Sequence, residues 1–116
     1  MSVVWGLTAA IEQLGATAAA IITNGNGETA HIANVVLCNT DSAARTFKLY
    51  HVPNNGGAVG TAEDEDLLFD DYSIDANDTL IINDLHIILD DTNDTLQGLA
   101  SVAAKVTVRC YGWVVS

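Results

Sequence analysis

Short apolar runs separated by clusters of turn-forming residues constrain the fold of this chain more than any other feature. Runs such as "AHIANVVLCN", "RTFKLYHV" and "KVTVRCYGWVV" are rich in β-branched and aromatic residues. They are separated by "NTDSA", "PNNGG" and "DAND", which are rich in residues that favour turns. Turn signals that recur about every 8 to 12 residues are typical of an all-β sandwich or barrel. The spacing therefore predicts an all-β, antiparallel β-sandwich.

About eight strands are predicted from these runs. They cover residues 3–9, 17–23, 30–39, 45–52, 66–74, 79–83, 85–89 and 105–115. The turn between 30–39 and 45–52 is expected to be hairpin-like. The N-terminal stretch would tolerate helix as well as strand, but Gly15 argues against one long helix. Jelly-roll and immunoglobulin-like topologies both remain open.

The length and composition predict one folded domain. A chain of 116 residues matches one ordinary domain, and 49% hydrophobic residues can drive collapse into a single core. We expect residues 1–116 to form one β-sandwich, in which residues 1–15 are an N-terminal strand or an arm that depends on assembly.

The charge disfavours two classes of partner. Four Lys and Arg residues against fifteen Asp and Glu residues give a net charge of -11, which repels nucleic acid phosphates and anionic lipid. No apolar run approaches the roughly 18 residues that span a bilayer, and the N-terminus lacks the basic region of a secretory signal. We therefore expect no direct nucleic acid or membrane partner and synthesis in the cytoplasm.

No catalytic constellation is visible. His31, His51 and His86 belong to different predicted strands, and no nucleophile elbow, zinc-protease or phosphate-loop motif accompanies them. Cys38 and Cys110 lack the spacing of a zinc or redox site, and we expect both to be buried and reduced. We predict a non-enzymatic protein with no catalytic residue, no metal ligand and no cofactor.

The stretch "DDTNDTLQG", residues 90–98, allows two interpretations. Its carboxylates suit calcium, but an EF-hand would need glycine where Leu96 stands and glutamate where Val102 stands. A turn explains the same residues, with Asn93 and Asp94 at its centre and a bend at Gly98. The turn is favoured, and an ion held between converging acidic loops stays open as the alternative.

The last predicted strand carries a candidate interface. Val106, Val108, Cys110, Gly112 and Val114 share one face and are predicted to face the core. The other face carries residues that are common where subunits meet. With one N-terminal residue added, the predicted interface is Trp5, Arg109, Tyr111, Trp113 and Val115.

The predicted strand at 30–39 is also apolar on both faces. Alternation places Ile32, Val36 and Cys38 on one face and Ala33, Val35 and Leu37 on the other. A two-layer sandwich covers only one face of each sheet by itself. An oligomer or a larger assembly would cover the second face, and a local loop is the alternative.

The segments "HIANVVLCNT", "TFKLYHV", "ANDTLIIND", "TLQGLAS" and "VTVRCYGWVV" resemble those of a group of small bacteriophage and prophage virion proteins. The resemblance runs through most of the chain from residue 16 onward, and it consists of strand and turn signatures. It implies a β-sandwich or jelly-roll subunit of a phage particle, often a head-decoration or cementing protein and sometimes a tail or fibre component.

Several further expectations follow from the resemblance. The partners would be the major capsid protein and copies of the chain itself, as a homotrimer, and the location would be the virion, on the surface of the head. The alternative is a tail or fibre module that binds another virion protein or a host glycan. The acidic segment "AEDEDLLFDD" departs from the group.

Overall fold

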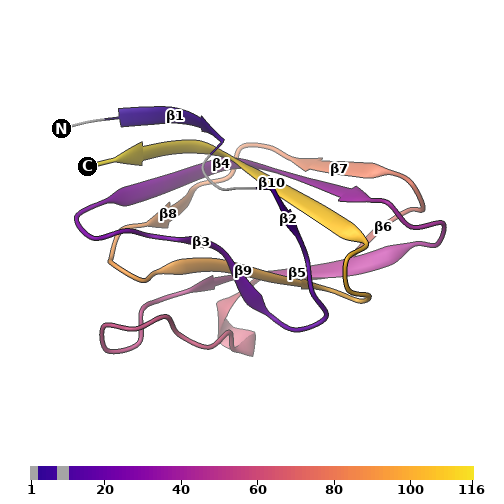
Figure 1. Cartoon of the computed structure of the whole chain (residues 1–116), viewed down its shortest axis with the longest axis horizontal. Helices are drawn as coiled ribbons and strands as arrows, with labels where there is room; N and C mark the ends of the chain where they lie inside the picture. The colour runs from indigo at the N-terminus through magenta and orange to yellow at the C-terminus, as the bar shows by residue number, and fades with distance from the viewer. Residues whose placement is uncertain (1–2, 8–10) are drawn as a thin grey trace.

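The computed structural model describes residues 3–7 and 11–116, which form two antiparallel sheets in a β-sandwich (Figure 1). Sheet A has the order β1-β10-β4-β7, with β2 also paired to β10 and β8 also paired to β4. Its strands are β1 (Val3–Leu7), β2 (Glu12–Gln13), β4 (Thr29–Asn39), β7 (Thr79–Ile82), β8 (Ile87–Leu89) and β10 (Val106–Val115). Sheet B has the order β3-β9-β5-β6 and comprises β3 (Ala19–Thr23), β9 (Thr95–Ala100), β5 (Arg45–Val52) and β6 (Leu67–Ile74). The predicted all-β, antiparallel sandwich is confirmed.

All of the predicted strands are present, with small shifts at their ends. Residues 8–9 of the first prediction lie outside the described residues. A three-residue 3-10 turn, η1 (Asp64–Asp66), precedes β6. In the described part of the chain there is no helix of the length and apolarity that a bilayer crossing requires.

The prediction of a hairpin-like turn between β4 and β5 is wrong. Strand β4 pairs with β10, β7 and β8 in sheet A, whereas β5 pairs with β6 and β9 in sheet B. Residues 40–44 therefore connect the two sheets. A turn cluster in the sequence marks where a strand ends, but strand partners far along the chain decide where the next strand goes.

Strand β9 corrects the interpretation of residues 90–98. Asn93 is at the predicted turn with a φ of 70°, but Thr95–Ala100 is a strand between β3 and β5, and Gly98 makes no bend. A Cβ at Gly98 would lie 2.9 Å from Ile21 Cδ1 and 3.1 Å from Leu49 Cδ2. The glycine therefore makes room for two large core side chains in the middle of sheet B.

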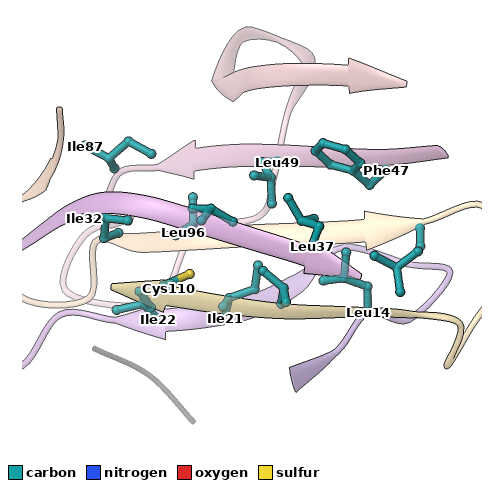
Figure 2. Packing of buried hydrophobic residues seen from close by; sticks show 14 of the residues in the cluster. Leu14, Ile21, Ile22, Ile32, Leu37, Phe47, Leu49, Ile87, Leu96 and Cys110 are labelled. Carbon is teal, nitrogen blue, oxygen red and sulfur yellow. The ribbon is translucent and has the colours of Figure 1, made fainter. Parts of the chain in front are cut away.

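The core fills the space between the sheets (Figure 2). Phe47 and Leu49 of β5 and Leu96 of β9 meet Leu37 and Val108 of sheet A in one buried cluster. The predicted core face of β10 is confirmed, because Val106, Val108 and Cys110 are fully buried, Gly112 is buried, and Val114 packs against the cluster.

A β-bulge in β4 changes the faces predicted for that strand. Tyr111 pairs with Asn34 but the next residue, Gly112, pairs with Ile32, so Ala33 is an extra residue. Ile32 therefore faces the core with Val35 and Leu37, and the prediction that it shares a face with Val36 and Cys38 is wrong. A Cβ at Gly112 would lie 1.8 Å from the His31 carbonyl oxygen. The bulge thus brings the two backbones so close that only glycine fits.

The first two strands pair with one edge of β10. Strand β1 pairs with its C-terminal half, from Tyr111 to Val115, and β2 pairs with Thr107 and Val108. Strand β1 and the end of β10 lie side by side (Figure 1). Residues 1–15 thus contribute strands to sheet A, and their dependence on assembly stays a prediction.

Candidate functional site: the outer face of sheet A

The two sheets differ in what covers their outer faces. In sheet B, residues 53–63, here called the covering loop, run along the side away from sheet A (Figure 1). Gln97 donates a hydrogen bond from Nε2 to the Gly60 carbonyl (2.9 Å), and Asn93 donates one from Nδ2 to the Gly57 carbonyl (2.8 Å). Asn54 donates its backbone N–H to Asp94 Oδ1 (2.8 Å). These hydrogen bonds attach the loop to β9 and to the turn before it.

The covering loop buries residues that do not belong to the core between the sheets. Tyr50 and Val52 of β5 pair with Gln97 and Thr95 of β9, and all four are buried. A Cβ at Gly60 would lie 3.0 Å from Val52 Cγ1, so the loop passes directly over β5. A local loop therefore covers the outer face of sheet B.

The opposite surface, the outer face of sheet A, has no such cover among the described residues. It comprises Thr107, Arg109, Tyr111, Trp113 and Val115 of β10, His31, Val36 and Cys38 of β4, Thr79 and Ile81 of β7, and Ile88 of β8. Ile81 is 58% exposed and Ile88 is 44% exposed. Large apolar side chains that are exposed on one face of a soluble protein often mark a surface that binds another molecule.

The outer face of sheet A also differs from the rest of the protein in charge. Strands β1, β4, β7, β8 and β10 contain no Asp or Glu, although the chain has fifteen, and Glu12 of β2 pairs with Val108 in the row that faces the core. Arg109 is the one Asp, Glu, Lys or Arg residue in these five strands. The centres of protein interfaces are depleted of charged residues and enriched in aromatic residues and arginine. The composition of this face matches that pattern.

Four of the predicted interface residues lie together on this face. Arg109 is exposed, and Tyr111, Trp113 and Val115 are half-buried. Trp5 stands opposite Trp113 in the β1–β10 register, and its side chain lies outside what the structure describes. Ile81 and Ile88 were not in the prediction, because the short apolar runs "TLII" and "HIIL" do not show which residues face the core.

An aromatic pocket of about 290 Å³ opens on this face beside the bulge. It is lined by His31, Ile32, Ala33, Asn34, Asp84, Leu85, His86, Ile87, Ile88 and Trp113. The rings of His31 and Trp113 are stacked, with centroids 4.8 Å apart and an interplanar angle of 9°. The bulge makes this stack possible, because it places His31 opposite Trp113 on the outer face.

A second depression, here called the Arg109 hollow, has a volume of about 320 Å³. It is lined by Val36, Cys38, Thr40, Thr79, Thr107 and Arg109. All of these residues except Thr40 belong to two neighbouring rows of paired residues, Thr107–Cys38–Thr79 and Arg109–Val36, and Ile81 continues the second row beside the hollow. The hollow therefore combines a cation and hydroxyl groups with apolar side chains.

The three histidines do not form one site. His31 and His86 both line the aromatic pocket, whereas His51 belongs to β5 in the other sheet. The lining of the pocket contains no serine, threonine or cysteine, as far as the described residues go. Within residues 3–7 and 11–116, no three His, Cys, Asp or Glu side chains are placed to hold a metal ion.

The acidic turn at residues 90–94 acts as a junction between loops. Asp91 accepts hydrogen bonds from the Thr92 N–H (2.9 Å) and from Asn54 Nδ2, and Asp94 accepts them from the N–H groups of Asn54 (2.8 Å) and Asp91 (3.1 Å). Asn24 of the β3–β4 turn donates from Nδ2 to the Asp91 carbonyl (3.0 Å). Every carboxylate oxygen of the two aspartates accepts a hydrogen bond from the protein. This supports the turn interpretation of the sequence.

The two cysteines lie on opposite sides of sheet A. Cys110 is fully buried in the core, and burial raises the pKa of its thiol to about 12. Cys38 is half-buried on the outer face of sheet A, so the prediction that both are buried is wrong for this residue.

Comparison of the chain with protein-family models and with curated protein sequences finds no match.

Proposed function

We propose that this protein is a structural subunit of a tailed bacteriophage particle, a decoration or cementing protein that binds the outside of the assembled head. The observation that carries the proposal is the outer face of sheet A, which exposes large apolar side chains, has no Asp or Glu in β1, β4, β7, β8 or β10, and is uncovered in the described chain. The sequence resemblance to small virion proteins supports the same function.

The proposed partners are the major capsid protein and two further copies of this chain, arranged as a homotrimer on the head. A subunit that binds the assembled shell and not its free components stabilises the shell by mass action. The acidic residues lie mainly in turns, in η1 and in β6. Docking through the outer face of sheet A would therefore leave most of the negative charge outside the contact.

Two exposed aliphatic residues, one on each sheet, provide the test. Ile81→Asp places a charge on the outer face of sheet A, whereas Leu68→Asp makes a matched change on β6, where the leucine is 41% exposed. Loss of a buried isoleucine contact costs about 1.5–3 kcal/mol, so Ile81→Asp should weaken binding to shells at least about tenfold. The measurement is co-sedimentation with shells that lack the protein.

Leu68→Asp should bind as well as the unchanged protein, and both variants should keep its melting temperature to within a few degrees. Electron microscopy of the decorated shells should locate the subunit on the outer surface. If the unchanged protein does not bind to shells, the proposal is wrong.

The aromatic pocket favours one alternative, a tail or fibre module that binds a glycan. Asn34, Asp84 and His86 have no side-chain hydrogen bond to another described residue, so their polar groups can face a sugar beside the His31–Trp113 stack. Binding of isolated protein to a glycan array, lost on Asp84→Asn, would favour this alternative over head decoration.

A further inference from the structure

Arg109 is the unusual residue on the outer face of sheet A. Arg45 pairs with Asp41 (2.6 Å), and Lys48 pairs with Asp70 and with Asp71 (3.2 Å). Arg109 makes no ion pair or hydrogen bond with any residue that the structure describes, although the chain has fifteen acidic residues. Arg109 is exposed on the outer face of sheet A, and no described residue neutralises its charge.

The surroundings of Arg109 suit a small anion. Thr79 and Thr107 line the same hollow, and their hydroxyl groups have no hydrogen-bond partner in residues 3–7 and 11–116. Thr40 already donates its hydroxyl to the Lys105 carbonyl (3.0 Å). The hollow thus offers a guanidinium and two hydroxyl donors with no acidic side chain in its lining. A carboxylate that accepts hydrogen bonds from a guanidinium fork forms a strong, directional pair.

We propose that the Arg109 hollow receives the carboxylate of a single Asp or Glu side chain on the protein surface that covers the outer face of sheet A. This inference rests on the proposed function and specifies the chemistry of the partner at the centre of the contact. Arginines in the desolvated centre of an interface are common hot spots.

The apolar surroundings indicate that the carboxylate comes from a protein. Val36 lines the hollow, and the highly exposed Ile81 lies in the same row of paired residues as Arg109. A partner that fills the hollow must therefore also cover apolar side chains, which a free phosphate or a nucleic acid backbone does not do. The net charge of -11 also repels polyanions.

Composition argues against a second copy of this chain as the occupant. Strands β1, β4, β7, β8 and β10 contain no Asp or Glu, so a copy that docked with the same face would bring no carboxylate from these strands to the hollow. The partner surface that fits has one carboxylate in an apolar patch, with neutral or basic residues around it that face the acidic turns of this protein.

Cys38 provides a native reporter for occupation of the hollow. It lines the hollow between Thr107 and Thr79 in the strand register, while Cys110 is buried in the core. A docked partner should slow alkylation of Cys38 and leave Cys110 unreactive as before.

The test compares Arg109→Gln with Lys105→Gln, which removes the same charge from an exposed site in the β9–β10 connection. Binding to shells that lack the protein should weaken roughly 10- to 100-fold for Arg109→Gln and less than about twofold for Lys105→Gln. Arg109→Lys keeps the charge but loses the planar fork, and should give an intermediate affinity. Shell binding should also slow alkylation of Cys38 in the unchanged protein.

Three results separate the possible failures. If Arg109→Gln binds shells as tightly as Lys105→Gln while Ile81→Asp still weakens binding, the inferred carboxylate site is overturned and the proposed function stands. If inorganic phosphate alone protects Cys38 in the free protein, the hollow is a free-anion site and the inference is overturned. If the unchanged protein does not bind shells, the proposed function is overturned together with the inference.

Discussion

At the scale of single residues, two glycines determine how closely the strands approach. Gly98 leaves space that the Ile21 and Leu49 side chains fill, whereas Gly112 lies against the backbone of His31 and Ile32. The ends of side chains can move when a methyl group is added, but a paired backbone cannot. The two positions should therefore respond differently to the same substitution.

We expect Gly98→Ala to lower the free energy of unfolding by about 1–3 kcal/mol, the usual cost of overpacking a core. Gly112→Ala should cost more, because its Cβ would lie 1.8 Å from the His31 carbonyl oxygen and the bulge would have to open. Urea unfolding of both variants measures the difference. Equal stability of the two would contradict the role given to Gly112.

At the scale of elements, buried asparagine side chains hold the turns together at the ends of β4. Asn39 is fully buried and donates from Nδ2 to the carbonyls of Ala43 (2.9 Å), Ile74 (3.0 Å) and Asp75 (3.2 Å). Its Oδ1 accepts a hydrogen bond from the Asp41 N–H (3.0 Å). One side chain thus connects the β4–β5 connection with the end of β6 and the turn after it.

Asn39→Ala should lower the free energy of unfolding by roughly 3 kcal/mol, because one buried and three partly buried backbone groups lose their hydrogen-bond partner together. Asn83→Ala, at an exposed position between β7 and β8, should change it by less than about 0.5 kcal/mol. Thermal and urea unfolding of the two variants provide the comparison. A small change in the unfolding free energy of Asn39→Ala would show that water molecules replace the hydrogen bonds of the lost side chain.

At the scale of the whole molecule, the sandwich is asymmetric. The covering loop closes the outer face of sheet B with its own hydrogen bonds, whereas no described segment covers the outer face of sheet A, where Ile81 and Ile88 are exposed. Most acidic residues lie in the turns and in η1, and β1, β4, β7, β8 and β10 contain none. This arrangement suits a subunit that docks with one face and keeps its acidic loops in solvent.

The two thiols should report this asymmetry in the free protein. At neutral pH iodoacetamide should modify Cys38, which is partly exposed on the outer face of sheet A, and should leave Cys110 unmodified. Burial raises the pKa of Cys110 to about 12, so little thiolate forms there below that pH while the protein is folded. Mass spectrometry of the native and the urea-unfolded protein measures both sites. Faster modification of Cys110 than of Cys38 in the native protein would contradict the fold.

The sequence by itself determined the fold class and much of the candidate site. Alternating β-branched residues and turn clusters are local signals, so they identified the strands that the structure contains, apart from β9 and the two-residue β2. The same alternation along β10 placed Arg109, Tyr111 and Trp113 on one face, because strand side chains repeat with a period of two. No distant contact is needed for either inference.

Only the tertiary structure decided which faces are covered. Strand β9 is a strand because it pairs with β3 and β5, which are remote in sequence, and Gly98 leaves room there for Ile21 and Leu49. The bulge at Ala33 moves Ile32 into the core and His31 beside Trp113, and it exists only when β4 pairs with β10. The covering loop closes the outer face of sheet B, and none of the described segments does the same for sheet A. Alternation gives each strand two faces, but long-range pairing and packing determine which of them meets the core, a loop or a partner.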